Sequence, residues 1–320
     1  MSAPATPSPT TPATPAAAVP TAAATPRRLL DWRVRFAALS VVWGFSFLFM
    51  KVGTEAYAPL QVSFGRVLCG SAVLLAALAW RRERLPRGRR TWLHLTVAAV
   101  LLNSLPFTLF AYSELTIPSS LAGICNATSP LWGMVLSLVA LSEDRPSRRR
   151  VAGLGIGFLG VLTVLGAWQG FSGLDAKGTA LALLAALSYP VGWIYVRRTL
   201  AGAEGSPLAM TGAQLLLATV QLGVLIPFFT PAPGGFALWP TLSVVALGAL
   251  GTGYALQAQY RLVGEIGPTT AQMVTYFIPV IATAAGVLVL GEELHWNTPV
   301  GAVIVLVGAA LTQSRPRRRP

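Results

Sequence analysis

Polar side chains recur at helical spacing inside apolar stretches of the chain. In the stretch 268–290, Thr269, Gln272, Tyr276 and Thr283 follow one another at i, i+3, i+7 and i+14, on one face of a helix. Such a stripe is costly against lipid, so it should face protein or water. Hydrogen-bonding groups of this kind can bind a solute, and we interpret the stripe as one wall of a cavity.

Three further apolar stretches carry similar polar positions. Tyr254 and Gln257 are three residues apart, Asn103 precedes Phe107 by one turn, and Asn126 precedes Pro130 by one turn. We expect the four helices that hold these residues to surround a central cavity. Hydrogen bonds that only hold the helices together remain the alternative for each residue.

Arg66 is the one basic residue well inside an apolar stretch. Its planar guanidinium can pair with a substrate carboxylate in a two-pronged contact. It can also extend to the interface or bond to a neighbouring carbonyl group. Both interpretations remain open.

Aromatic residues fall into two sets. Trp43, Tyr189 and Trp193 lie within apolar stretches and are candidates for lining or gating a cavity. Five other tryptophans lie at the ends of such stretches, as interfacial aromatic residues do.

Two prolines lie near the middle of apolar stretches, Pro130 and Pro279. A proline inside a helix removes a backbone hydrogen bond and kinks the helix. We expect kinks at both positions, acting either as hinges or as fixed features of helix packing.

Several kinds of chemistry lack the residues they need. All eleven Asp and Glu residues lie in connectors or at helix ends, so no relay of buried carboxylates for protons is expected. No partners at metal-site or catalytic spacing accompany Cys69, Cys125 or His94. The glycine-rich stretches lack the following Lys-Ser/Thr of a phosphate-binding loop. The sequence therefore predicts no enzyme activity, metal or cofactor.

The elements that position these residues are membrane spans. The chain is 54% hydrophobic and 11% charged, against about 25% charged in soluble domains. A membrane-spanning helix needs about 20 apolar residues. We predict an all-helical protein with ten spans, near residues 34–53, 60–80, 92–113, 118–141, 151–168, 176–197, 208–229, 239–260, 268–290 and 298–313.

The basic residues orient these spans. The net charge is +13, and 21 of the 24 Lys and Arg residues lie in flanks and connectors that alternate along the chain. The positive-inside rule then predicts that both termini lie in the cytoplasm. We expect the protein to lie in the cytoplasmic membrane. This placement explains the positive charge without nucleic-acid binding. Residues 1–30, rich in Pro, Ala and Thr, should form a disordered tail, and 314–320 a basic cytoplasmic tail.

The two halves of the chain repeat one another. Gly44 matches Gly192 and Tyr112 matches Tyr260 at an offset of 148, and Pro130 matches Pro279 at 149. Spans one to five (34–168) thus correspond to spans six to ten (176–313). Because five is odd, the second copy must cross the membrane in the opposite sense, as in many secondary transporters.

Specific motifs also resemble a known family. The segment from Trp43 to Lys51 (WGFSFLFMK), the Phe64-Gly65-Arg66 motif, and the ending of each half, from Pro130 to Gly160 and from Pro279 to Gly308, resemble the EamA domains of the drug/metabolite transporter superfamily. The second half departs from this pattern, because it carries Gln214 where the first has Arg66.

The resemblance implies a secondary transporter that exports a small organic metabolite, such as an amino acid, a related metabolite or a drug. Its partners would be this solute and the lipid bilayer, and the sequence does not distinguish a monomer from a homodimer. A membrane scaffold or sensor without transport, and a channel, are the alternative functions.

Overall fold

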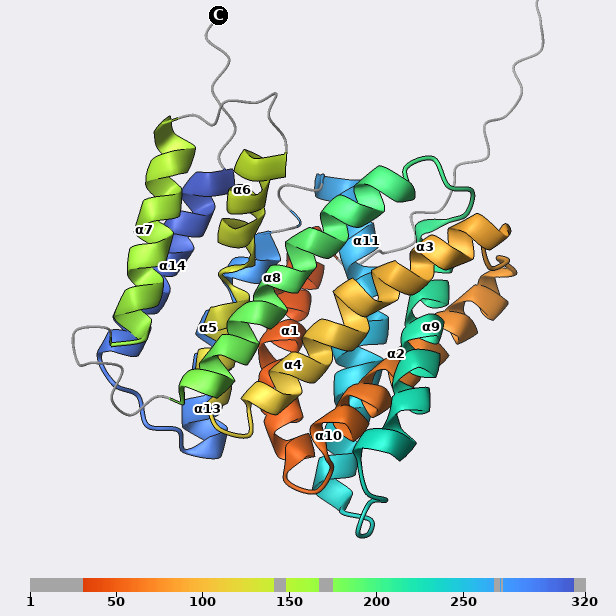
Figure 1. Ribbon diagram of the computed structural model, residues 1–320, viewed down its shortest axis with the longest axis horizontal. Helices are drawn as coiled ribbons and strands as arrows, with labels where there is room; N and C mark the ends of the chain where they lie inside the picture. The colour runs from red at the N-terminus through yellow and green to blue at the C-terminus, as the bar shows by residue number, and fades with distance from the viewer. Residues whose placement is uncertain (1–30, 141–147, 167–174, 268–270, 272, 314–320) are drawn as a thin grey trace, which may run out of the picture. The chain divides into compact units, whose positions relative to one another are not determined.

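The structure is a computed structural model that describes residues 31–140, 148–166, 175–267, 271 and 273–313. The expected tails, 1–30 and 314–320, and Gln272 lie outside these ranges. Contacts divide the chain into Met1–Asp31 and Trp32–Pro320, and all that follows concerns the second unit. Its described residues form helices and connectors only (Figure 1).

The first half contains the helices of the first five predicted spans. They are α1 (Trp32–Thr54), α2 (Pro59–Arg81), α3 (Arg89–Ala99), the π-helical turn η1 (Val100–Ser104), α4 (Leu105–Ser113), α5 (Ser119–Asn126), α6 (Ser129–Ala140) and α7 (Arg148–Val164). The helices α3, η1 and α4 run on without interruption as one segment, Arg89–Ser113.

The second half repeats this order. Its elements are α8 (Ala176–Thr199), α9 (Pro207–Phe229), α10 (Leu238–Gly248), the π-helical turn η3 (Ala249–Tyr254), α11 (Ala255–Ile266), the 3-10 turn η4 (Met273–Tyr276), α13 (Ile278–Leu290) and α14 (Asn297–Gln313). Both π-helical turns lie within matching spans, the third and the eighth, and begin 149 residues apart.

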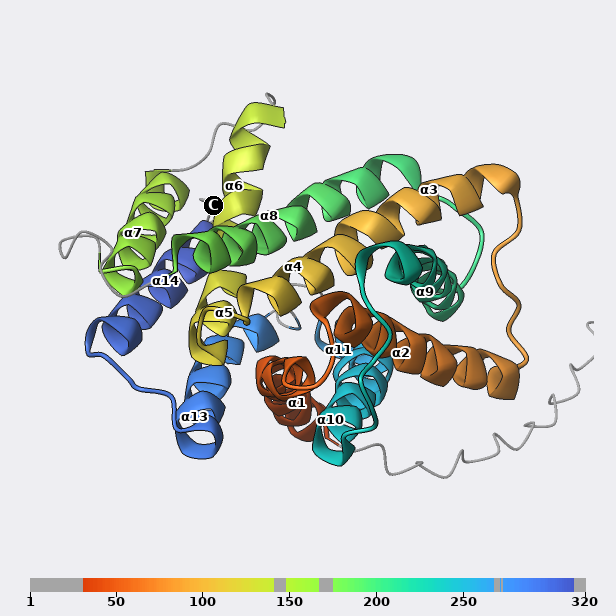
Figure 2. The ribbon, with the colours of Figure 1, turned by 60° about the horizontal axis from the view of Figure 1, so that its bottom comes forward.

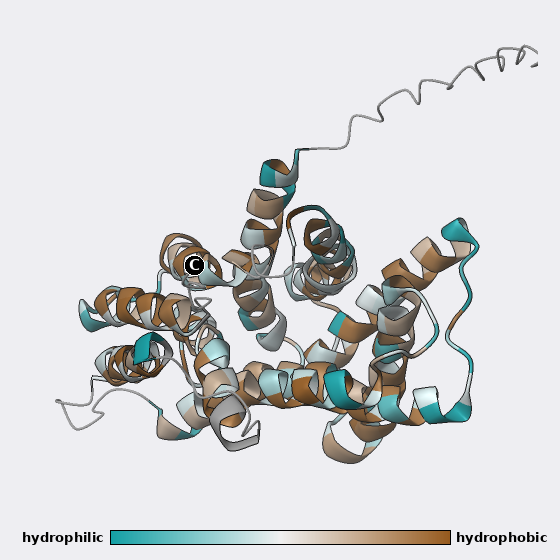
Figure 3. Cartoon of the chain, turned by 90° about the horizontal axis from the view of Figure 1, so that it is seen from above, coloured by the Kyte–Doolittle hydropathy of each residue, from teal (hydrophilic) through white to brown (hydrophobic). Residues whose placement is uncertain are grey.

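Seven described helical segments are long and apolar enough to cross a membrane. They correspond to the predicted spans one, two, three, six, seven, eight and nine. The fifth and tenth are shorter apolar helices, Val151–Val164 and Asn297–Thr312, and the fourth is divided between α5 and α6. Large apolar side chains such as Leu288 and Phe228 are exposed, and brown apolar residues cover much of the helices in Figure 3. Lipid would cover these surfaces.

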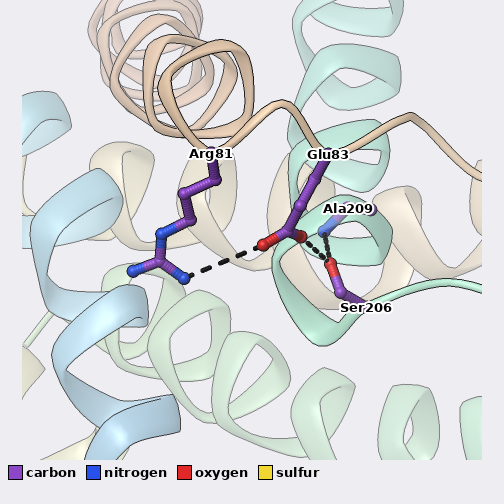
Figure 4. A network of polar contacts seen from close by, with 4 residues as sticks. All are labelled: Arg81, Glu83, Ser206 and Ala209. Carbon is purple, nitrogen blue, oxygen red and sulfur yellow. Dashed lines mark hydrogen bonds and ion pairs between the residues drawn. The ribbon is translucent and has the colours of Figure 1, made fainter.

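Local signals start several helices. Pro59 and Pro207 lie in the first turns of α2 and α9, where a missing N–H is tolerated. Ser206 caps α9 by accepting a hydrogen bond from the Ala209 N–H at 3.1 Å. Its own hydroxyl donates to Glu83, which also lies 4.0 Å from Arg81 (Figure 4). This contact joins the connector after α2 to the start of α9.

Helix contacts follow the sequence repeat. In the first half α1 packs against α13, and in the second half α8 packs against α5 and α6. Likewise α8 packs against α4, and α1 against α10 and α11. The corresponding helices α2 and α9 also pack together, as do α7 and α14, which lie side by side in both ribbon views (Figures 1 and 2). These contacts between the halves therefore occur in matching pairs.

Glycines permit the closest of these contacts. A Cβ atom on Gly308 of α14 would lie 2.3 Å from the backbone nitrogen of Gly157, and one on Gly160 would lie 2.5 Å from that of Val305. The backbones of α7 and α14 are thus in direct contact, as in other membrane helix pairs with small residues.

Helix ends and connectors that the charge pattern assigns to one side of the membrane contact one another. On the predicted cytoplasmic side, Arg35 pairs with Glu265 at 2.5 Å, and His94 Nδ1 lies 2.8 Å from Tyr195 Oη. On the other side, Thr116 donates to Asp175 at 2.9 Å.

Candidate binding site between the two halves

Arg66 is buried where the two halves of the protein meet. It lies on α2, and its Nε donates a hydrogen bond to Thr252 Oγ1 of η3 at 3.0 Å. The guanidinium carbon lies 3.7 Å from the centre of the Phe107 ring on α4. A cation over an aromatic face is attracted by the ring's quadrupole, so the guanidinium is held from two sides.

A second polar pair occupies the matching place in the other half. Gln214, the residue that corresponds to Arg66, donates from Nε2 to Asn103 Oδ1 at 2.5 Å. Asn103 lies in η1 and is buried, as Thr252 is in η3. In each half, therefore, a polar side chain of the second span bonds to the π-helical turn of the other half. Sequence reasoning named Arg66 and Asn103 but missed Gln214 and Thr252 as their partners.

Two of the three candidate aromatic residues also lie inside the helix bundle. Tyr189 on α8 packs against two apolar clusters and is close enough to Arg66 for an electrostatic interaction. Trp43 on α1 is half-buried and packs against the clusters beside α13 and α11. Trp193, by contrast, is 55% exposed.

The remaining candidates belong mainly to the eighth and ninth spans. Tyr254 ends η3 and is 40% exposed, and Gln257 on α11 is half-buried. Tyr276 ends η4, and its buried hydroxyl has no hydrogen-bond partner among the described residues. Asn126 ends α5 and is half-buried.

Both prolines begin helices, which corrects the expectation of kinks within continuous helices. Pro130 is the second residue of α6, which is separated from α5 by Ala127 and Thr128. Pro279 is the second residue of α13, which follows the 3-10 turn η4. A proline in the interior of a helix removes a backbone hydrogen bond, because it has no N–H. In the first turn of a helix the backbone N–H groups have no acceptor within the helix, so a proline there removes none. The fourth span is therefore divided before Pro130, and the ninth changes from 3-10 to α-helix at the matching place before Pro279.

A buried carboxyl group lies near Arg66 that sequence reasoning placed only at a helix end. Glu114 directly follows the spanning segment Arg89–Ser113, and its side chain is fully buried. Neither carboxyl oxygen has a hydrogen-bond partner in the described part of the chain. Burial raises the pKa of Glu114 well above its usual range, although Lys51 lowers it in part.

The turn after Glu114 is tied to two neighbouring elements. Lys51 Nζ, at the end of α1, donates to the Glu114 carbonyl and, at 3.2 Å, to that of Ile117. The carboxylate of Glu292 accepts hydrogen bonds from the N–H of Ser119 at 2.6 Å and of Ser120 at 3.1 Å, and so caps α5.

An open pocket of about 390 Å³ lies over this turn. Its lining residues are Lys51, Leu115, Thr116, Ile117, Pro118, Asp175, Glu292, Glu293 and His295. Hydrogen bonds from the Gly178 N–H and Thr116 lower the pKa of Asp175. Within the described ranges, no three His, Cys, Asp or Glu side chains are grouped so as to hold a metal ion.

Known proteins resemble this chain over most of its length. The model of the EamA-like transporter family matches residues 33–166 and again 176–313. An uncharacterised transporter of Archaeoglobus fulgidus is 25% identical over 87% of this chain and 96% of its own length. The uncharacterised inner membrane transporter YedA of Escherichia coli K12 is 27% identical over 91% and 95%.

One crystal structure of a protein is similar in fold. It has a TM-score of 0.61 and 19% identity, and the match covers 88% of this chain and 95% of the other.

Proposed function

The chain belongs to the EamA-like transporter family and is a multi-pass membrane transporter, and we propose that it exports a small organic metabolite by alternating access. The candidate substrates are amino acids, related metabolites and drugs. In this proposal ten spans form two inverted repeats, 34–168 and 176–313, with both termini in the cytoplasm and the protein in the cytoplasmic membrane.

The observation that carries the proposal is the pair of reciprocal contacts between the halves. Arg66 with Thr252, and Gln214 with Asn103, join matching positions across the interface. A carrier built from inverted repeats binds its substrate where the repeats meet. Two equivalent sets of contacts, exchanged as one half tilts against the other, suit such a cycle.

The two pairs are unequal in charge, which suggests where the substrate binds. Arg66 is the basic side chain in these two pairs, and its Nε donates to Thr252. The terminal nitrogens of the guanidinium are the groups we assign to a carboxylate or another anionic group of the substrate. Tyr189 and Trp43 would then contact its apolar part, and Asn103, Asn126, Gln257, Gln272 and Tyr276, with Tyr254 and Trp193 at the margin, would complete the site.

The breaks at Pro130 and Pro279 supply the movement in this proposal. Discontinuous helices are common at the binding sites of secondary transporters. The half-helices on either side of each break can change their angle without losing an intact run of backbone hydrogen bonds. We therefore assign the hinge role to Pro130 and Pro279.

The first test is flux in proteoliposomes with a panel of labelled amino acids, nucleosides, sugars and aromatic cations. A carrier gives saturable flux of at least one compound. Arg66→Ala should then reduce kcat/KM at least about tenfold, equivalent to about 1.4 kcal/mol of binding in the transition state. The matched control is Arg84→Ala, because Arg84 is an exposed arginine in the connector after α2.

Other outcomes would contradict the proposal. Flux that rises linearly with concentration, together with ohmic current in a planar bilayer, would indicate a channel. Absence of flux for every class in the panel would favour a scaffold or sensor. An Arg66→Ala protein as active as wild type would remove Arg66 from the binding site.

A further inference from the structure

Glu114 differs from the other carboxyl groups at the predicted outer end of the protein. Glu292 accepts hydrogen bonds from Ser119 and Ser120, and Asp175 accepts them from Gly178 and Thr116. Glu114 is 0% exposed, and neither of its oxygens has a partner among the described residues. An ionised carboxylate without hydrogen bonds is strongly disfavoured in such a place, whereas a neutral carboxyl group is tolerated.

Charged and titratable groups face Glu114 from each element around it. Lys51 approaches from α1 and Arg66 from α2, and both positive charges favour its ionised form. Glu292, which follows α13, opposes ionisation, and Tyr189 on α8 lies beside Arg66. Lys51 and Arg66 are not within ion-pair distance of the Glu114 carboxyl in this arrangement, since the described ion pairs do not include them. Thus no direct contact with a described residue fixes the Glu114 carboxyl in either its ionised or its neutral form.

An open pocket lies beside the turn that follows this carboxyl. Residues 115–118, which directly follow Glu114, line the open pocket described above together with Lys51. Lys51 also donates hydrogen bonds to the carbonyl oxygens at both ends of the turn. A small movement of the turn or of Lys51 would therefore connect the carboxyl with the pocket.

The cluster has no counterpart in the second half of the chain. At the offset of 148, Lys51 corresponds to Thr199 and Glu114 to Leu262. The contacts of Arg66 with Thr252 and of Gln214 with Asn103 are reciprocal between the halves, but this pair of charges is not. A titratable site at one end of an otherwise repeated framework gives the two membrane faces different chemistry.

We propose that Glu114 is the proton-binding site of this transporter, reached from the pocket over residues 115–118, and that its protonation is coupled to closure of that end. The proposal rests on the proposed transport function. With the outer end open, the hydrated carboxylate takes a proton from water in the pocket, and a neutral carboxyl group results. Closure then buries this neutral group. When the inner end opens, the proton returns to water on the cytoplasmic side, favoured by the positive charge of Arg66, and the metabolite enters the site from that side. The metabolite leaves to the outside when the outer end opens again and Glu114 takes up the next proton.

The first experiment needs no substrate. Infrared difference spectra of the protein in lipid nanodiscs are recorded through a pH titration, and the carbonyl stretching band of a protonated carboxyl group is followed. Wild type should show this band at neutral pH and lose it in alkaline buffer. Glu114→Gln should remove it, while Glu293→Gln, which changes an exposed glutamate lining the same pocket, should keep it. A band that persists unchanged in Glu114→Gln overturns the assignment.

The second experiment uses whichever panel compound shows saturable flux. An inward proton gradient of tenfold should accelerate efflux of that compound severalfold in wild type and leave it unchanged in Glu114→Gln. Exchange of labelled for unlabelled compound at equal pH should persist in Glu114→Gln, which shows that the variant is folded and binds. Wild-type efflux that does not respond to the gradient overturns proton coupling.

The two experiments separate this proposal from the proposed function. If no compound moves, the transport proposal fails, and the infrared titration still decides whether Glu114 binds a proton. If transport is found but the titrating band belongs to another group, only the proton site fails.

Discussion

Arg66 shows how a charged side chain is kept inside a membrane-spanning segment. Thr252 supplies an oxygen acceptor at 3.0 Å and Phe107 an aromatic face at 3.7 Å, so the charge is stabilised without a directly paired carboxylate. Removing the Thr252 hydroxyl would leave a buried charge with one partner fewer, and such losses cost about 1–3 kcal/mol. The arrangement leaves the outer nitrogens of the guanidinium available to a ligand.

Glu114 should make the stability of the protein depend on pH. Because its pKa is raised in the folded protein, the native state keeps a proton that the unfolded chain loses above about pH 4.3. Stability then falls as the pH rises from that value to the folded pKa, by about 1.4 kcal/mol for each unit of pH. We expect Glu114→Gln to remove this decline and to raise the melting temperature in detergent at neutral pH.

The comparison to make is the melting temperature of wild type and Glu114→Gln from pH 5 to pH 8, with Glu293→Gln as control. Asp175 does not disturb this window, because its lowered pKa places its titration below it. Parallel curves for wild type and Glu114→Gln would show that the carboxyl does not titrate there.

At the scale of the element, the divided fourth and ninth spans are the most distinctive feature. Pro130 has no N–H to donate to the carbonyl of Asn126, four residues earlier, and that carbonyl instead accepts from the hydroxyl of Ser129 at 2.8 Å. A local side chain, that of Ser129, thus stabilises the break before α6. The transition before α13 lies at the corresponding position of the second half, because Pro279 matches Pro130 in the repeat.

Replacement of both prolines by alanine should restore continuous helices. Pro130→Ala and Pro279→Ala each supply the missing N–H, and we expect each to lower the maximal flux severalfold with melting temperature unchanged or raised. Flux and thermal unfolding are measured on the same reconstituted samples. Pro227→Ala, at an exposed position near the end of α9, is the control and should leave flux unchanged. Normal flux in all three variants would exclude a hinge at the breaks.

The apolar pattern predicted elements better than it predicted contacts. The length of the apolar runs and the placement of proline suffice to predict the seven long helical segments. Pro130 and Pro279 also marked the positions where the helical geometry changes, although the sequence predicted kinks there. The partners of Arg66 and Asn103 could not be deduced, because Thr252 and Gln214 are distant in sequence and lie beside them only through packing of the two halves. The match of Gln214 with Arg66, and the position of Thr252 between Gly251 and Gly253, were the available signals.

The burial of Glu114 could not be deduced from the sequence for a related reason. A carboxylate at a helix end is normally exposed, and hydropathy alone gives no hint of the α1 and α8 segments that enclose this turn. Its surroundings emerge only when the whole bundle is assembled. The same holds for the polar candidates Tyr254, Gln257 and Tyr276, whose spacing indicated a shared face but not the depth or neighbours of each.

At the scale of the whole molecule, the inverted arrangement makes a prediction about the loops. In a background with Cys69→Ala and Cys125→Ala, single cysteines are placed at Glu143 and Glu293, which lie in corresponding segments of the sequence repeat. A thiol reagent that does not cross membranes should label Glu293→Cys in intact cells and Glu143→Cys only after permeabilisation. Labelling of both from the same side would contradict the inversion.

The close pair formed by α7 and α14 bears on the lipid around the protein. The described part of each helix has 17 residues, and at 1.5 Å per residue it is about 26 Å long. The hydrocarbon layer of a typical bilayer is about 30 Å thick. Beside these two helices the bilayer has to thin or the flanking residues have to reach outward, since direct backbone contact leaves the pair little freedom to separate. We therefore expect membrane thickness, and with it the choice of lipid, to act on this protein at this pair of helices.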